Sequence, residues 1–430
     1  MAYVAAGVIE VIAWGDRVGA VAPAGRGYAF EYDPAWIRSG RELAPSLMPL
    51  RRRPYVFPGL NPDTFMGLPP MIADSLPGRF GNALVDTWMS EQGIPTESIT
   101  SLDRLAYLGS RGMGALEFRP DGAPHQPAPT ALDLSELVQM ARAAVQGSLG
   151  SERESEAALR RILQVGTSAG GARAKAIVSF NPETADVRSG HSPRQHGFEA
   201  WMLKFDGVGA DLQLGTPGGY GRIEYAYAEM ARAGGIDIAP TRLLEENGRA
   251  HFMTQRFDRD DAGARRHLQS LCGMDALDYN AIATNSYEQL FVRIAALDLG
   301  EDALRDAWRR MAFNVAARNH DDHTKNHSFL YTPEAGWSLS PAYDVTYAYN
   351  PTGRWTRHHL MSVNGRFDGI TFDDLRAVGE RFQVPGIRDL AAQVGDAVGD
   401  WHVFADAAGV PAATTRLIAG AHDLAALSPR

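Results

Sequence analysis

The sequence predicts an α+β fold of two lobes, with a mixed α/β N-terminal lobe and an all-helical C-terminal lobe. In the first part of the chain, short runs of β-branched and aromatic residues are separated by glycine and proline turns, which is typical of strands. From residue 267 onward, apolar residues recur every three to four positions, which is typical of helices. The chain has 430 residues, more than one hydrophobic core usually organises, so we expect separate packed units.

The first unit, residues 1–120, should contain a small sheet followed by helices. Residues 4–33 hold strand-like runs broken by tight turns, and residues 70–94 and 101–108 have a more helical pattern. The proline-rich stretch at 119–130 then interrupts regular structure. This stretch predicts the boundary of the unit.

The second unit, residues 131–258, has the order of elements expected of the nucleotide-binding part of the first lobe. A glycine-rich turn at 166–175 leads into an apolar strand, and a second strand follows a polar loop. A later helix ends at a glycine pair, the usual stop signal. The expected helices are 134–145, 152–163 and 222–233, and the expected strands are 176–180, 198–205 and 251–257.

The third unit, residues 259–430, is expected to be the helical C-terminal lobe. Apart from a turn-rich stretch at 331–355, its apolar residues mostly keep helical spacing. The expected helices are 286–299, 301–318, 372–382, 386–398 and 411–427.

Composition limits the classes of function and of compartment. The formal net charge is -9, which argues against direct binding of nucleic acid through a general basic field. The single cysteine, Cys272, excludes an internal disulfide and a cysteine-rich zinc site, and it suits a reducing cytoplasm. No apolar run approaches the roughly 18 residues that a membrane helix needs. We expect a soluble cytoplasmic protein without membrane contact.

The densest group of polar residues is NHDDHTKNHSFLY at 319–331. Asp321 and Asn326 are five positions apart, as are the catalytic Asp and the magnesium-binding Asn of the kinase catalytic loop. Asp344 follows further along and would be the second magnesium ligand.

Two other interpretations of this segment remain open. Asp321 and Asp322 could cap a helix or lie in a solvated loop, which is the commoner role of an isolated Asp pair. Alternatively, the helically spaced His320, His323 and His327 could bind one metal ion, although no HExxH or His-Cys pattern accompanies them.

Phosphate-binding candidates precede this segment. Gly170 and Gly171 could bring backbone N–H groups to phosphate oxygens, or they could belong to a flexible hairpin, since GTSAGGARAK is neither a Walker A nor a GxGxxG motif. Lys204 lies in an apolar strand and needs an anionic partner, for which Glu224 on the next helix is placed. An exposed lysine on an edge strand is the alternative.

The strand FMTQRFD at 252–258 could offer its backbone to adenine, because a strand that connects two lobes exposes N–H and C=O groups. The whole order, from glycine loop through lysine, glutamate and connector to Asp, Asn and Asp, is the order of these parts in protein kinases.

The chain also resembles the HipA toxins of type II toxin–antitoxin systems, which are atypical serine/threonine kinases. The resemblance extends over nearly the whole length. Its landmarks are FEYDPAWI (30–37), ADSLPGRFG (73–81), YLGSRGMGALEF (107–118), GTSAGGARAKA, FMTQRFDRD, NHDDHTKN and LSPAYDVTYA.

The resemblance implies a protein-kinase-like, HipA-type fold and a use for each candidate residue. Asp321 would be the catalytic base, Asn326 and Asp344 the Mg²⁺ ligands and Lys204 the ATP lysine. The other cofactor-binding residues would be Gly170, Gly171, Glu224, Gln255, Phe257 and Lys325. Ser168 would be autophosphorylated, which is implied to displace the glycine loop, with Thr167 as a competing acceptor. Gln255 and His320 depart from the residues usual in relatives.

The resemblance further implies a HipB-like helix-turn-helix antitoxin as partner, a protein substrate such as a tRNA-charging enzyme, and DNA contact only through the antitoxin. Two rival functions remain. A small-molecule kinase of related fold would share the acidic residues but not the N-terminal landmarks. A catalytically silent partner in a repressor complex would keep the fold without needing intact acidic and lysine positions.

Overall fold

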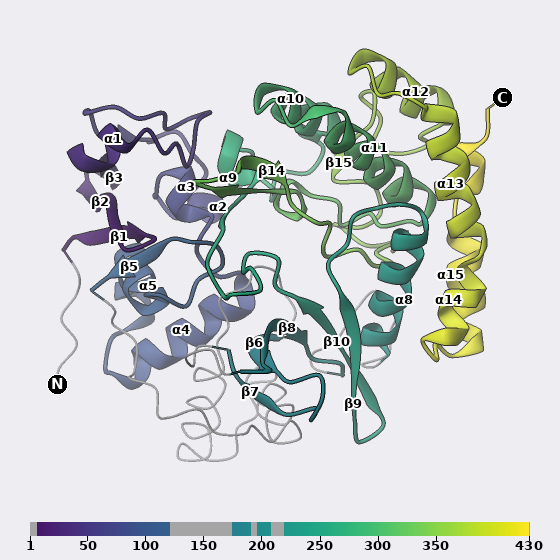
Figure 1. Cartoon of the computed structure of the whole chain (residues 1–430), viewed down its shortest axis with the longest axis horizontal. Coiled ribbons are helices and arrows are strands. Elements are labelled where there is room, and N and C mark those ends of the chain that lie inside the picture. Colours follow the sequence, from purple (N-terminus) through teal and green to yellow (C-terminus); the bar gives the residue numbers. More distant parts are fainter. Residues whose placement is uncertain (1–6, 121–173, 191–195, 208–218, 430) are drawn as a thin grey trace.

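The computed structural model of the chain describes four stretches, which are residues 7–120, 174–190, 196–207 and 219–429 (Figure 1). The helices expected at 134–145 and 152–163 lie outside the described residues. The same holds for Ser168, Gly170 and Gly171 of the glycine-rich turn.

The N-terminal domain begins with an antiparallel sheet and continues with short helices. Its elements are β1 (Ile9–Ala13), β2 (Asp16–Ala24), β3 (Gly27–Tyr32), α1 (Pro34–Ser39), β4 (Tyr55–Val56), α2 (Pro62–Phe65), α3 (Pro70–Ala73), α4 (Arg79–Glu91), η1 (Thr96–Ser98), α5 (Ser101–Leu108) and β5 (Glu117–Arg119). The strand order is β4-β3-β2-β1-β5. Inward-facing residues such as Val11 and Phe30 form its core with Trp36. The strands expected within 4–33 are confirmed.

The second sheet is the framework of the candidate site. Its strands and the helix that follows β8 are β6 (Lys175–Phe180), β7 (Val187–Ser189), β8 (Glu199–Lys204), α8 (Tyr220–Ala233), β9 (Thr241–Glu246) and β10 (Arg249–Gln255). The order β7-β6-β8-β10-β9 puts β8 in the middle. Helix α4 of the N-terminal domain packs Val85 and Met89 against Val178 and Leu203 of this sheet. The N-terminal domain therefore helps to cover the second sheet.

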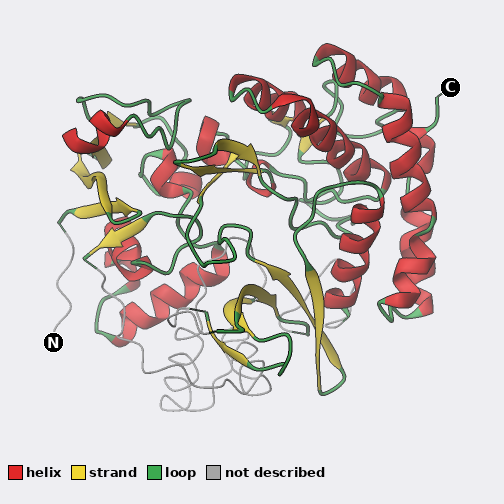
Figure 2. Ribbon diagram, viewed as in Figure 1, coloured by secondary structure: helices red, strands yellow, loops and turns green. Residues whose placement is uncertain are grey.

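The remaining helices are α9 (Leu271–Asp275), α10 (Tyr287–Ala296), α11 (Gly300–Ala316), η2 (Thr324–Asn326), α12 (Phe372–Arg381), α13 (Ile387–Gly399), α14 (Trp401–Ala407), α15 (Ala412–Ala421) and η3 (Leu424–Leu427). Most of them, from α10 to α15, gather on one side of the molecule, whereas α9 lies next to α3 (Figure 1 and Figure 2). Trp308 and Phe313 of α11 are fully buried in their common core, which also takes in Tyr227 of α8. In the described part of the chain, no helix combines the length and the apolar character that crossing a membrane requires.

The prediction of an all-helical second lobe needs one amendment. The lobe also holds a three-stranded sheet, in the order β11-β13-β14, and a two-stranded parallel pair. These strands are β11 (His267–Ser270), β12 (Asn285–Ser286), β13 (Ser328–Thr332), β14 (Gly336–Leu339) and β15 (Met361–Ser362). They have at most five residues each, too few for a period of two to stand out from a turn-rich sequence.

Candidate active site

Lys204 is a buried lysine with two acidic partners. It ends the central strand β8, and its residue is 7% exposed. Its Nζ donates hydrogen bonds to a carboxylate oxygen of Glu224 on α8 and to Oδ1 of Asp344. The Phe252 ring on the neighbouring strand lies 5.5 Å from the same ammonium. The alternative of an exposed lysine on an edge strand is thereby excluded.

The charges of this group stabilise one another. Burial alone would lower the pKa of Lys204, but Asp344 and Glu224 outweigh it and raise that pKa above the ordinary value. Burial would likewise raise the pKa of Asp344, whereas the charges of Lys204 and then Lys175 hold it far below its usual range. At neutral pH, therefore, the Lys204 ammonium and the Asp344 carboxylate are ionised.

Lys175 is a second buried lysine, to which the sequence analysis gave no role. It begins β6, is 4% exposed and pairs in register with Lys204. Its charge also acts on Asp344. The reasoning that singled out Lys204, a lysine in an apolar strand, applies equally to this residue. Two lysines therefore lie close to one carboxylate.

The acidic pair of the catalytic-loop candidate separates into two environments. The Asp321 side chain is 49% exposed, whereas the Asp322 side chain is fully buried. Asp322 accepts hydrogen bonds from the Tyr287 hydroxyl at 3.0 Å and from the Leu360 N–H at 2.7 Å, and His359 Nδ1 lies 2.8 Å from it. Asp322 therefore anchors the loop, and Asp321 is the carboxylate that a substrate could reach.

Asn326 is fixed by the same loop. A 3-10 turn, in which the Asn326 N–H donates to the His323 carbonyl at 2.8 Å, folds the loop back on itself. The side-chain amide of Asn326 donates to the Asp321 carbonyl at 2.7 Å. That bond uses the amide nitrogen and leaves Oδ1 without a hydrogen-bond donor among the described residues. The five-residue spacing thus brings these two positions together.

Asp344 has an uncommon backbone conformation. Its φ is +54°, in the left-handed region, which Asp tolerates better than most residues. One carboxylate oxygen contacts Lys204. The preceding Tyr343 donates from its hydroxyl to the Lys325 carbonyl at 2.6 Å, so the Asp344 segment is tied to the catalytic-loop candidate.

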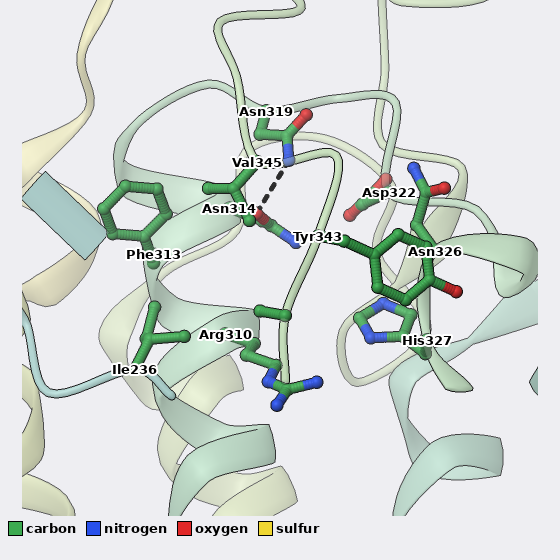
Figure 3. A pocket seen from close by; sticks show the side chains of 11 residues that line it. Ile236, Arg310, Phe313, Asn314, Asn319, Asp322, Asn326, His327, Tyr343 and Val345 are labelled. Atoms are coloured by element: carbon green, nitrogen blue, oxygen red, sulfur yellow. Dashed lines mark hydrogen bonds between the residues drawn. The ribbon is translucent and has the colours of Figure 1, made fainter. Parts of the chain in front are cut away.

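A cavity behind the loop shows how these segments converge (Figure 3). Tyr343 points into it from the Asp344 segment, and Asn326 and His327 point into it from the catalytic loop. Arg310 and Asn314 of α11 also line it. A second cavity is lined by Lys204 and Asp344 together with Met202, Phe252 and Thr254 of β8 and β10. The two cavities share Tyr343.

The connector between the lobes retains one unused donor. The N–H of Gln255 donates to the Pro240 carbonyl and that of Arg256 to the Ala200 carbonyl, both at 2.9 Å. The Phe257 N–H has no acceptor within the described stretches. The Phe257 ring lies 5.7 Å from the Tyr343 ring, so the connector faces the Asp344 segment.

Lys325 lies on the side of the loop that faces the N-terminal domain. Its Nζ is 3.9 Å from Asp74 Oδ1 and 5.2 Å from the centroid of the Tyr279 ring. Burial would lower the pKa of Lys325, but Asp74 outweighs burial and raises that pKa. This contact with Asp74 could not be read from the sequence.

The histidines of the loop do not converge on one point. His320 Nδ1 lies 3.1 Å from the Thr356 carbonyl, the His323 ring packs on Tyr279, and the His327 ring packs on Tyr287. Within the stretches that the structure describes, no group of three or more His, Cys, Asp or Glu side chains is arranged to hold a metal ion. The three-histidine alternative therefore has no support.

The donor set fits a magnesium–triphosphate group. Mg²⁺ prefers carboxylate, amide and phosphate oxygens, which Asp344, Asn326 and the phosphates themselves would supply. The buried ammonium groups of Lys204 and Lys175 would meet phosphate oxygens. Mg²⁺ usually keeps several waters, so two protein ligands are enough and a protein cage of three is not needed.

Family models and solved structures agree on the relationship. The HipA N-terminal domain matches residues 9–119, and the HipA-like C-terminal domain matches residues 167–402, more than half of the chain. The structure is similar to that of HipA in the complex of the Shewanella oneidensis MR-1 toxin–antitoxin system with HipB and operator DNA. That match has 17% identity, covers 96% of each chain and has a TM-score of 0.63.

A Helicobacter pylori proinflammatory kinase, CtkA, matches more distantly, with 12% identity over 52% of this chain and 90% of that chain. Its TM-score of 0.31 is too low to carry an argument. The comparison with curated protein sequences gives no match. The kinase-like two-lobed fold expected from the sequence is confirmed, and the chain belongs to the HipA family.

Proposed function

We propose that the chain is a Mg-ATP-dependent serine/threonine protein kinase of the HipA type, which phosphorylates a cytoplasmic protein and itself. One observation carries the proposal. The Lys204 ammonium is buried between Glu224 and Asp344, which is how kinases hold the lysine that aligns the α- and β-phosphates. A buried charge cluster of this kind, beside a cavity, is also typical of functional sites.

Each residue has a separate task in this proposal. Lys204 and Lys175 bind phosphate oxygens, and Glu224 keeps Lys204 in place. Asp321 orients the substrate hydroxyl and accepts its proton, while Asn326 and Asp344 hold the metal. Bound Mg²⁺ would neutralise charge on the phosphates.

Adenine and the glycine loop complete the proposed binding mode. The Gln255 carbonyl and the Phe257 N–H would meet the adenine edge, the latter because its donor is unused. Gly170 and Gly171 would cover the phosphates. Phosphorylation of Ser168 in that loop would add about -1.5 to -2 charges beside ATP and favour a displaced loop. A HipB-like antitoxin, through which DNA is contacted, belongs to the same proposal.

Replacement of the base tests the proposed reaction. Asp321→Ala should lower the transfer of phosphate from γ-labelled ATP to the chain itself by at least 100-fold, because a positioned base contributes that much. The exposed Asp261→Ala is the matched control and should transfer at the wild-type rate. Mass spectrometry of the wild-type tryptic peptide 162–173 should find the label on Ser168. Undiminished transfer by Asp321→Ala would rule out Asp321 as the base.

A further inference from the structure

The short helix α9 belongs to two hydrophobic cores. Leu271 and Met274 are buried in the core of the helical lobe, whereas Cys272 is buried in the core of the N-terminal domain. The Leu271 N–H donates to the carbonyl of His327, at the end of the catalytic loop, at 2.7 Å. A shift of the N-terminal domain would therefore displace α9, and with it the end of that loop.

Asp74 fastens the start of α9. It directly follows α3 in the N-terminal domain, and its side chain is 8% exposed. One carboxylate oxygen accepts the Ser270 N–H and the other accepts the Ser270 hydroxyl, both at 2.6 Å. Ser270 is the N-cap of α9 and in turn accepts the Gly273 N–H at 3.2 Å. One carboxylate from the N-terminal domain thus holds the cap of a helix in the other lobe.

The same carboxylate reaches the catalytic loop. Asp74 Oδ1 lies 3.9 Å from Lys325 Nζ, and among the described residues no other carboxylate lies within 4.0 Å of that ammonium. Lys325 directly precedes Asn326, whose amide is bonded to the Asp321 carbonyl. Asp74 therefore contacts a residue, Lys325, that is adjacent to Asn326 in the chain and lies in the same loop as Asp321.

We propose that Asp74 is a positioning residue for phosphoryl transfer. It holds the Lys325 ammonium beside the catalytic loop, so that the N-terminal domain takes part in the chemistry of the other lobe. A lysine side chain has a flexible four-carbon stem, and an anionic partner orders that stem before substrate arrives. The ordered ammonium can then stabilise charge on the transferred phosphoryl group. This inference rests on the proposed function.

A double-mutant cycle separates positioning from a merely structural role. Asp74→Asn should lower kcat for label transfer from γ-labelled ATP to the chain by roughly tenfold, the size of coupling seen between contacting residues, with KM for ATP nearly unchanged. Lys325→Met should lower kcat at least as much. In the Lys325→Met background, Asp74→Asn should cause no further loss of kcat. Exposed Asp63→Asn in the same domain is the matched control and should keep the wild-type kcat.

Gly273→Ala provides a second way to disturb the same carboxylate. A Cβ at Gly273 would lie 2.6 Å from the Asp74 carboxylate carbon and from Oδ2, so the carboxylate must shift while its charge stays. Alanine favours the helix, so α9 itself should persist. The kcat of Gly273→Ala should fall, and this loss too should vanish in the Lys325→Met background. This variant decides the question if Asp74→Asn does not fold.

The outcomes are distinct. If the wild type is active and the kcat losses of Asp74→Asn and Lys325→Met multiply in the double variant, the positioning role is overturned and the proposed kinase function stands. A change in KM alone overturns it as well. A folded wild type that transfers no phosphate with Mg-ATP overturns the proposed function and this inference together. If the double variant loses no more kcat than Lys325→Met alone, the inference is supported.

Discussion

At the scale of single residues, the group of Lys204, Glu224 and Asp344 affects the free energy of unfolding. Glu224 is 2% exposed, and the hydrogen bond from Lys204 offsets the cost of burying its carboxylate. Both side chains of the pair are buried, so loss of one partner leaves the other charge buried. Such losses usually cost more than the intact pair contributes.

Lys204→Met should therefore destabilise the protein as well as inactivate it. We expect a loss of about 3 kcal/mol in the free energy of unfolding, because the substitution removes a buried positive charge that pairs with both Glu224 and Asp344. Denaturant unfolding at neutral pH measures it. Adding Glu224→Gln to Lys204→Met should recover part of the stability but none of the activity. An unchanged unfolding midpoint for Lys204→Met would contradict this account of the pair.

The sequence was sufficient for some residues of the site and insufficient for others. Lys204 could be recognised because a charged residue in an apolar strand needs an anionic partner. Glu224 could be named as that partner because it lies on the helix that follows the strand. Lys175 carries the same signal and was overlooked. Asp74 could not be found, because its partners Ser270 and Lys325 are remote in sequence and its own surroundings look like an ordinary turn.

At the scale of elements, α8 lies unusually close to β10. An added Cβ on Gly221 would lie 1.9 Å from the Ala250 carbonyl oxygen. Only glycine permits this approach, which places α8, and with it Glu224, beside the sheet that carries Lys204. The geometry of the Lys204–Glu224 ion pair therefore depends on glycine at position 221.

Gly221→Ala tests that dependence. The added methyl group should force α8 away from β10 and destabilise the protein by roughly 1–3 kcal/mol, the usual cost of overpacking. It should also weaken binding of Mg-ATP in a calorimetric titration. Gly420→Ala in α15 is the matched control, because a Cβ there meets nothing within 4 Å and alanine favours a helix. Equal free energies of unfolding for the two variants would show that α8 can move away from β10 without loss of stability.

The pattern of predicted and missed elements follows from their length. Helix α8 and strands β8 and β10 have enough residues for their periods to be read, and the long helices α10 to α13 were located to within a few positions. The two-residue pair β12 and β15 depends on contact between segments far apart in the chain. Its strand character comes from that contact, not from local preference.

At the scale of the whole molecule, several histidines are buried in the neutral form. Burial lowers the pKa of His267 to about 4, that of His320 to about 3 and that of His327 to about 3, from an ordinary value of 6.5. Between those values and 6.5, the unfolded chain binds more protons than the folded chain. Stability therefore rises with pH across this window and falls as the pH is lowered through it.

We expect the free energy of unfolding to fall between pH 7 and pH 5, by on the order of 1 kcal/mol per buried histidine per pH unit below 6.5. Buried carboxylates such as Asp344, whose pKa is lowered, add their own loss only below about pH 4. Denaturant titrations at several pH values measure the slope. His327→Gln should make it shallower, and a flat profile above pH 5 would contradict the neutral burial of these side chains.

The N-terminal domain is fastened to the rest of the molecule at several places, and Asp74 is one of them. Besides Asp74, the buried Asp258 at the end of the connector accepts the Gly114 N–H at 2.6 Å, and Arg256 donates to its carboxylate. The domain therefore touches both the connector between the lobes and the catalytic loop. The described part of the N-terminal domain is thus joined to both lobes of the rest of the chain.

The position of Cys272 gives this cohesion a practical consequence. Its thiol is the only one in the chain, and burial between domain and helix raises its pKa to about 12. Because the thiol is buried in the core of the N-terminal domain, we expect an alkylating reagent to reach it when the contact between that domain and α9 opens. The rate at which the unaltered protein is labelled should therefore report on opening of this contact, with no engineered probe and no second thiol to contribute to the signal.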